Sequence, residues 1–204
     1  MALLLLDRDE EQRLIRERQK SGGDRYDEVW DGVYVMSPLA NLEHQGFAFQ
    51  FASIIQEALG RHSGAIVLAG ANVSDRDKGW AKNYRVPDVT VTLPGGKAQD
   101  CGTHWFGGPD FVVEVVSRDD RSREKFDFYA AIGVRELLLL DRYPWSLELY
   151  RLRDGVLALV GKSRPERPEA LISEVLPLTF RLVAGEPRPT IEVDHSDGVR
   201  SWSA

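Results

Sequence analysis

The chain has almost no cysteine, and it lacks any long apolar run. Its 204 residues include one cysteine, Cys101, which excludes a disulfide within the chain and a zinc site built from cysteines. The apolar residues 3–6 are too few for a membrane span or a signal peptide, and acidic residues follow them at once. We therefore expect an intracellular, cytoplasmic protein without a membrane partner.

The chain also lacks an excess of positive charge. Its net charge is −6, whereas proteins that coat DNA without sequence preference use Lys and Arg to neutralise phosphates. The four histidines show no metal-ligand spacing. These features argue against a generic DNA-coating protein, but they leave room for an enzyme that has a local basic groove.

Intermixed helix and strand patterns indicate the α+β (or α/β) class, as a single domain with a central mixed β-sheet flanked by helices. We expect helices over residues 7–20, 42–59 and 119–132, strands over 65–69, 89–93, 110–116 and 136–140, hairpins over 28–36 and 147–160, and loops over 72–83 and 95–108. The expected segments are a charged helical N-terminus over 1–24, the main domain over 25–183, and a polar tail over 184–204.

Glu114 is the most informative residue, because it interrupts the apolar run Phe-Val-Val-Glu-Val-Val over residues 111–116. Such a run is typical of an interior strand, so we expect the carboxylate to be buried. Burying an ionised carboxylate is unfavourable unless a cation or strong hydrogen bonds meet it. The residues alone leave two partners open: a structural counter-ion such as Lys125 or an arginine, or a metal ion.

Asp88 and Lys125 are the residues best suited to join Glu114. Asp88 stands at the head of the alternating strand 89–93, and Glu114 lies in the long strand that follows it in the chain. Neighbouring strands lie about 4.8 Å apart, so the two carboxylates could share a hard cation such as Mg²⁺. Lys125 shares a helical stripe with three core-type residues, so we expect its ammonium to face the sheet. Taken singly, Asp88 is also typical of a turn, and Lys125 of a solvated helix surface.

Several short motifs follow one another in a characteristic order: Glu28-Val29-Trp30-Asp31-Gly32, Met36-Ser37-Pro38, His44-Gln45, Pro87-Asp88, residues 111–117, Lys125-Phe126-Asp127-Phe128-Tyr129, Gly133-Val134-Arg135-Glu136 and Asp141. In this order, over about residues 25–183, they resemble the Uma-two family. That family is a bacterial group of restriction-type endonucleases in the PD-(D/E)XK nuclease superfamily. The resemblance implies a restriction-endonuclease-like core and divalent-metal-dependent hydrolysis of phosphodiester bonds, with DNA as the substrate.

The resemblance also implies roles for individual residues. Asp88 and Glu114 become catalytic metal ligands for Mg²⁺ or Mn²⁺, and Lys125 becomes the catalytic lysine. The carbonyl of Val115 becomes a further metal ligand. The superfamily usually has a lysine two residues after the glutamate, where this chain has Val116, so the resemblance implies that Lys125 replaces it from the helix.

Other interpretations of these residues remain open. Glu28 could approach the metal, although a surface position on its strand is the favoured interpretation. His44 could contact a substrate phosphate or be an ordinary polar residue of a first helical turn. The whole protein could be an inactive binding or structural protein with a nuclease fold, or a hydrolase of RNA or another phosphate ester. A homodimer fits cleavage of both DNA strands.

Overall fold

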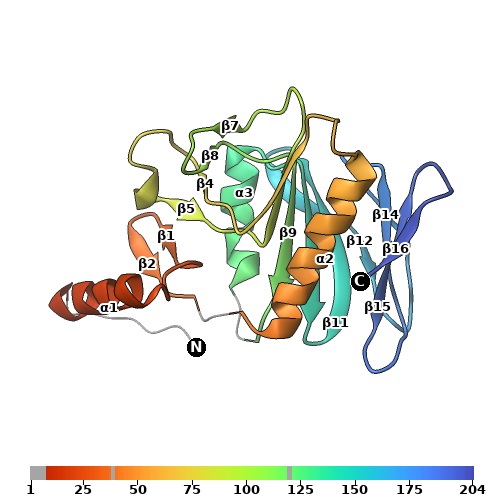
Figure 1. Ribbon diagram of the computed structural model, residues 1–204, viewed down its shortest axis with the longest axis horizontal. Helices are drawn as coiled ribbons and strands as arrows, with labels where there is room; N and C mark the ends of the chain where they lie inside the picture. Colours follow the sequence, from red (N-terminus) through yellow and green to blue (C-terminus); the bar gives the residue numbers. More distant parts are fainter. Residues whose placement is uncertain (1–7, 38–39, 119–120) are drawn as a thin grey trace.

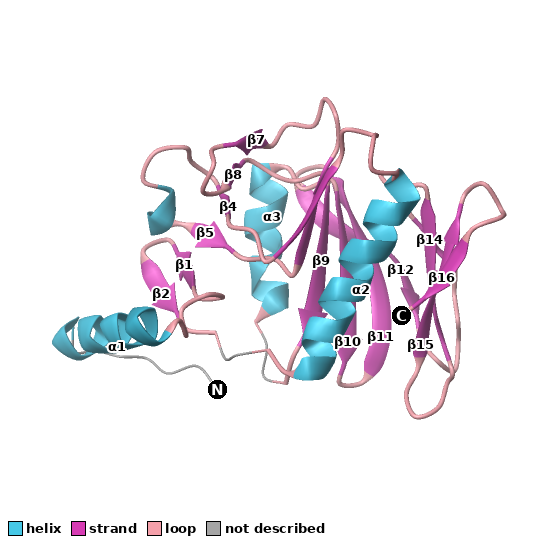
Figure 2. Ribbon diagram, viewed as in Figure 1, coloured by secondary structure: helices cyan, strands magenta, loops and turns pink. Residues whose placement is uncertain are grey.

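The computed structural model of the chain describes residues 8–37, 40–118 and 121–204 (Figure 1). Three α-helices and three β-sheets make up the regular structure of this described part. A mixed sheet forms the centre of the fold (Figure 2). A second sheet is built from short strands of the N-terminal part of the chain, and a third is built from the C-terminal segment. None of the helices in the described ranges is long and apolar enough to span a membrane.

The central sheet has six strands in the order β12-β11-β10-β9-β6-β3. Their bounds are β3 Ile66–Ala69, β6 Val89–Thr92, β9 Phe111–Val116, β10 Glu136–Arg142, β11 Trp145–Arg153 and β12 Val156–Ser163. β9 and β10 run parallel, while the other neighbours are antiparallel. The expected mixed sheet is therefore confirmed, and the buried Glu114 strand lies in its interior.

The two faces of this sheet pack against different elements. α2 (Leu42–Leu59) covers one face, where its aromatic and aliphatic side chains meet Val113 and Val115 of β9. α3 (Phe126–Ile132) covers the other face, where Phe128 and Tyr129 meet Val112 and residues of β10. Because side chains alternate along a strand, Glu114 faces α3. α2 has the predicted bounds, and its predicted N-cap Asn41 accepts a hydrogen bond from the backbone of the first turn.

The N-terminal sheet is built from short strands in the order β2-β1-β5-β4-β8-β7. Their bounds are β1 Glu28–Trp30, β2 Val33–Val35, β4 Val73–Ser74, β5 Tyr84–Arg85, β7 Gln99–Asp100 and β8 Trp105–Phe106, with the 3₁₀ turn η1 at Trp80–Lys82. The predicted hairpin at Asp31-Gly32 is confirmed. The prediction of plain loops over 72–83 and 95–108 is wrong, because β4, β7 and β8 lie within them.

The helix α1 (Arg8–Ser21) confirms the predicted charged N-terminal helix. It is tied to the N-terminal sheet through Asp27, whose carboxylate accepts from Arg18 at 2.6 Å and from the hydroxyl of Tyr34 at 2.7 Å. The backbone N–H of Ser37 also donates to Asp27 at 2.7 Å. This buried carboxylate therefore joins the helix, the hairpin and the chain segment that leads towards α2.

The prediction of a polar tail over 184–204 is wrong. β15 (Thr190–His195) and β16 (Ser201–Ser203) complete an antiparallel sheet with β13 (Leu171–Ile172) and β14 (Leu178–Val183). Ile191 and Val193 are fully buried, and the C-terminal Ala204 also packs into the main core. The two apolar residues alternate with polar ones, so a polar composition concealed a half-buried strand.

The predicted helix over 119–132 is shorter than expected. Residues 119 and 120 lie outside the described part of the chain. A 3₁₀ turn, η2, spans Ser122–Lys125, and the α-helix begins only at Phe126. Lys125 therefore lies at the junction of the two helical segments.

Candidate acidic site

Glu114 lies on β9 with only 2% of its surface exposed. Its Oε1 and Oε2 atoms lie 3.1 and 3.2 Å from the ammonium nitrogen of Lys125. Tyr129 donates its hydroxyl to Oε1 at 2.5 Å, and Ser122 donates to Oε2 at 3.4 Å. The buried carboxylate is thus met by one cation and two hydroxyl groups, all from η2 and α3.

Asp88 immediately precedes β6, which pairs with β9. Val89 lies opposite Val113, so one further step of the antiparallel register brings Asp88 opposite Glu114. The N–H of Val115 donates to Asp88 Oδ2 at 2.7 Å. The two acids lie on neighbouring strands as predicted, whereas their roles as metal ligands, and that of the Val115 carbonyl, stay predictions.

Lys125 faces the sheet, as its position on the helical stripe predicts. Its Nζ atom lies 3.1 Å from Glu114 and 3.0 Å from Glu28 Oε1. The side chain is 12% exposed, so the ammonium is largely removed from water. One lysine therefore serves two buried carboxylates.

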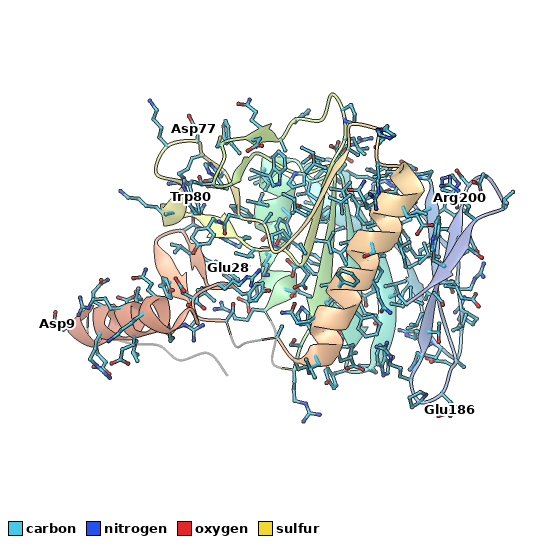
Figure 3. All side chains as sticks on the ribbon, in the orientation of Figure 1. Asp9, Glu28, Asp77, Trp80, Glu186 and Arg200 are labelled. Atoms are coloured by element: carbon cyan, nitrogen blue, oxygen red, sulfur yellow. The ribbon has the colours of Figure 1, made fainter. Side chains whose placement is uncertain are left out.

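Glu28 corrects one of the predictions from the sequence. The favoured interpretation was a surface acid, but Glu28 is 2% exposed and lies on the inner side of the N-terminal hairpin (Figure 3). Its Oε1 accepts from the N–H of Val86 at 2.8 Å, and its Oε2 accepts from Trp30 Nε1 at 2.6 Å. β1 pairs with β5, and that pairing carries Glu28 into the site.

His44 lies in the first turn of α2 and is buried. Its Nε2 atom lies 2.7 Å from Asp88 Oδ1, and its Nδ1 atom lies 3.0 Å from the hydroxyl of Ser117. The imidazole therefore bridges Ser117, which follows β9, and Asp88, which precedes β6, from the predicted position in a first helical turn. A contact between His44 and substrate phosphate stays a prediction.

The cluster of Glu28, Asp88, Glu114, Lys125 and His44, here called the acidic site, contains three carboxylates and one lysine. Burial raises the pKa of Glu114 to about 8; Lys125 opposes this rise, while Asp88 and Glu28 add to it. Burial and the neighbouring Glu114 also raise the pKa of Tyr129. The acidic site is therefore poor in positive charge.

The donor chemistry of the acidic site fits a hard divalent cation, because carboxylate oxygens are the ligands that Mg²⁺ and Mn²⁺ take. From the described residues, each oxygen of Asp88 has one hydrogen bond, which leaves lone-pair capacity. In the described part of the chain, no group of three or more His, Cys, Asp or Glu residues is arranged to hold a metal ion as it stands. The lysine occupies the position between two of the acids.

A hollow of about 440 Å³ borders the acidic site. It is lined by Ser117 and Ser122, which contact His44 and Glu114, and by three arginines, Arg118, Arg121 and Arg123. Glu124 and Asp141 line the same hollow; Arg121 is paired with Glu124, and Arg123 with Asp141 and Glu148. The hollow therefore holds charges of both signs beside the acidic site.

Two contributors to the site were not predicted from the sequence. Tyr129 is a fully buried core residue, as its place on the helical stripe predicts, and its hydroxyl also binds Glu114, which the sequence did not predict. Ser122 was not considered. The spacing of Lys125 and Tyr129, one helical turn apart, is the signal that places both on Glu114.

Known proteins share features with this chain. The model of the Uma2 family, described as "putative restriction endonuclease", matches residues 11–185. The crystal structure of a "putative nuclease belonging to DUF820" from Anabaena variabilis ATCC 29413 matches with a TM-score of 0.55 and 17% identity. That match covers 72% of this chain and 80% of the other, and at this identity it shows the fold alone. No match is found among curated proteins.

Proposed function

Since this chain belongs to the Uma2 family, we propose that it is an endonuclease that hydrolyses phosphodiester bonds in DNA with a divalent cofactor, Mg²⁺ or Mn²⁺. One observation carries the proposal: the buried carboxylates of Glu28 and Glu114 share one lysine, Lys125, and Asp88 adds negative charge beside Glu114. Buried carboxylates without enough counter-charge are unfavourable. A divalent cation would correct this imbalance.

Asp88, Glu114 and the carbonyl of Val115 are the groups that would hold the cation, and Glu28 would add negative charge beside them. When bound, the cation supplies Lewis-acid chemistry: it neutralises charge on the phosphate oxygens and makes water more acidic. His44 of α2 and the N–H of Val115 on β9 each bind one oxygen of Asp88, so they orient that carboxylate.

Lys125 would orient the attacking water and stabilise the negative charge that develops in the transition state. Its ammonium is positioned by Glu28 and Glu114. Tyr129 in turn fixes the orientation of Glu114 through its hydroxyl. The positions of these groups depend on packed elements, namely β9, η2 and α3, which suits a task that needs defined geometry.

The DNA backbone would approach through the hollow beside the acidic site, where Arg118 and Arg121 line it. Arginine is well suited to phosphate, because its guanidinium offers several donors in one plane. Cleavage of both strands would use two copies of the chain, and a symmetric homodimer is the simplest arrangement.

An inactive binding protein with the same fold is the second candidate. The observation in its favour is that Lys125 already bridges Glu28 and Glu114, so the buried acids have a structural counter-ion. A hydrolase of RNA or of another phosphate ester would use the same acids, and only the choice of substrate separates it from a DNA endonuclease.

Nicking of supercoiled plasmid tests the proposal. Wild-type protein is expected to nick the plasmid with Mg²⁺ or Mn²⁺ and not with EDTA. Glu114→Gln is expected to abolish nicking. Glu148→Gln, which changes another buried acid of the same sheet face, is the matched control and should retain it at a temperature where circular dichroism shows all proteins folded.

The results separate the candidates. Equal nicking by wild type and Glu114→Gln indicates a contaminating nuclease and overturns the assignment. No nicking by any of the proteins, on DNA, RNA and a small phosphodiester alike, supports the inactive binding protein. Cleavage of RNA alone moves the assignment to a ribonuclease.

A further inference from the structure

A second hollow, of about 690 Å³, lies between the N-terminal sheet and α3. It is lined by Trp30, Phe106 and Phe128, by the acids Asp31 and Asp127, and by Arg85. A hollow of this size, with apolar walls and a few polar groups, is typical of a site for a small organic group. We call it the Arg85 pocket.

Arg85 is buried at 4% exposure, yet only part of its guanidinium is hydrogen-bonded. All of its hydrogen bonds leave from Nη1, and they reach Val29 O, Asn83 Oδ1 and Tyr84 O at 3.0, 3.1 and 3.2 Å. Among the described residues, its buried Nε has no partner, and no hydrogen bond leaves from Nη2. Buried donors are normally paired, so an unpaired donor needs an explanation.

Nε and Nη2 form one edge of the guanidinium plane, which can bind two acceptor atoms side by side. Arg121 uses this edge to bind Glu124, at 2.9 and 2.6 Å. In Arg85 the same edge has no protein acceptor among the described residues. The guanidinium is nevertheless held in place, because its carbon lies 4.7 Å from the ring centre of Trp30 and 4.2 Å from that of Phe128.

The carboxylates that line the pocket determine which kind of ligand could accept hydrogen bonds from Arg85. Four carboxylates line it, those of Asp31, Asp75, Glu124 and Asp127. Asp75 and Glu124 are paired with Arg76 and Arg121, whereas the carboxylates of Asp31 and Asp127 bind no other described residue. A phosphate or carboxylate ligand would be repelled here. A neutral planar ligand with two acceptors on one edge and donors on another fits both Arg85 and the free carboxylates.

We propose that the Arg85 pocket binds an unpaired guanine of the DNA substrate. Guanine is a neutral planar base whose O6 and N7 atoms accept from one arginine edge. Its N1–H and amino group are free to donate to Asp31 and Asp127 when the base is outside a duplex. The proposal rests on the nuclease function proposed above, and it adds a base preference to that function.

The position of the pocket connects it to the acidic site. Trp30 lines the pocket and donates to Glu28 Oε2, and Val86, which follows Arg85, donates to Glu28 Oε1. Glu124 of the pocket and Lys125 of the acidic site are consecutive residues. A base held by Arg85 would therefore lie beside the groups proposed to act on its strand.

The test compares two single-stranded oligonucleotides that differ at one atom of guanine. Each has one guanine in a thymine background, either as normal guanine or as 7-deazaguanine, which lacks the N7 acceptor. Binding is followed by fluorescence anisotropy in EDTA, where cleavage is prevented. We expect the dissociation constant of wild-type protein to be about tenfold larger for the 7-deazaguanine strand, as for the loss of one good base contact.

Arg85→Lys is expected to remove the difference between the two strands, because an ammonium cannot bind two acceptors in one plane. Arg200→Lys is the matched control; Arg200 immediately precedes β16, on the opposite side of the molecule (Figure 3), and this variant should keep the difference. Should Arg85→Lys fail to fold, the comparison of the two strands on wild-type protein still decides.

Equal dissociation constants for the two strands on wild-type protein, or no binding of either strand, overturn the proposal. Free deoxyguanosine that binds as tightly as the oligonucleotide also overturns it, since the ligand would then be a nucleoside and not DNA. A tenfold difference between the two dissociation constants, without plasmid nicking, would support the guanine site and contradict the proposed nuclease function. Plasmid nicking with equal dissociation constants would support the nuclease function and contradict the guanine site.

Discussion

Glu114 and Glu148 lie on the same face of the central sheet, and Leu139 of β10 pairs with both of them. Both acids are almost completely buried, at 2% and 3% exposure. Their electrostatic states are nevertheless opposite. The pKa of Glu114 is raised to about 8, and the pKa of Glu148 is lowered to about 2.

The difference comes from the ratio of cations to acids. Burial alone would raise the pKa of Glu148, but hydrogen bonds from Arg123, Lys162 and Tyr150 outweigh it. The distances to Glu148 are 2.6 Å from Arg123 and 2.5 Å from Lys162. Glu114 instead shares Lys125 with another carboxylate.

Both arrangements depend on η2, which supplies Arg123 to Glu148 and Lys125 to Glu114. One turn of chain therefore completes a closed structural ion cluster on one side and an acid-rich site on the other. The comparison teaches that burial of an acid is a weak indicator of function. A buried acid whose neighbours leave it short of positive charge is a stronger one.

Replacing each cluster's lysine should have the largest contrasting effect. Lys125→Gln is expected to lower the rate of plasmid nicking by a factor of about 10²–10³, the loss typical of removing one group that stabilises transition-state charge. It should retain Mn²⁺ binding, because Lys125 is not a ligand. Lys162→Gln, which removes a lysine from Glu148, should nick at the wild-type rate. Similar rates for the two variants would break the contrast.

Replacing the acid of each cluster should affect stability more at Glu148 than at Glu114. Glu148→Gln removes the buried carboxylate that Arg123 and Lys162 share, and we expect it to lower the free energy of unfolding by about 2–3 kcal/mol. Glu114→Gln keeps the shape of the side chain and removes an acid that is short of counter-charge, so its cost in EDTA should be below about 1 kcal/mol. Urea unfolding at pH 7 measures both. A larger loss for Glu114→Gln would mark Glu114 as a structural ion-pair partner.

The two acids should also differ in pH dependence. In the folded protein Glu114 keeps its proton up to about pH 8, against an ordinary pKa of 4.5, so between these values the folded state binds more protons than the unfolded state. The stability of metal-free wild type should therefore fall relative to Glu114→Gln by about 3 kcal/mol from pH 5 to pH 8. Glu148 ionises below this window, so its contribution stays constant there. Parallel stability curves for wild type and Glu114→Gln would contradict the raised pKa.

Local sequence patterns predicted the elements whose signals lie within a few residues. Asn41 and the spacing of apolar residues defined α2, and Asp31-Gly32 defined the first hairpin. The apolar neighbours of Glu114 predicted its burial, and the helical stripe predicted that Lys125 faces the sheet. These predictions succeeded because one element alone determines them.

The failed predictions, and the contacts that the sequence did not predict, depend on interactions between distant segments. Glu28 lies on a strand of three residues, too short to show a buried face, and its burial follows from the pairing of β1 with β5. The bond between His44 and Asp88 joins residues 44 positions apart in sequence. Ile191 and Val193 become a buried strand only because β14 supplies a partner.

Isothermal titration of Mn²⁺ into metal-free protein tests most directly whether the acid-rich cluster, and not the closed one, is the metal site. Wild type, Glu114→Gln and Glu148→Gln are compared, because glutamine keeps the shape of the glutamate side chain. Wild type and Glu148→Gln are expected to bind one Mn²⁺ per chain with similar affinity, while Glu114→Gln binds at least about tenfold more weakly, which corresponds to about 1.4 kcal/mol. Equal binding of Mn²⁺ by wild type and Glu114→Gln would contradict the account.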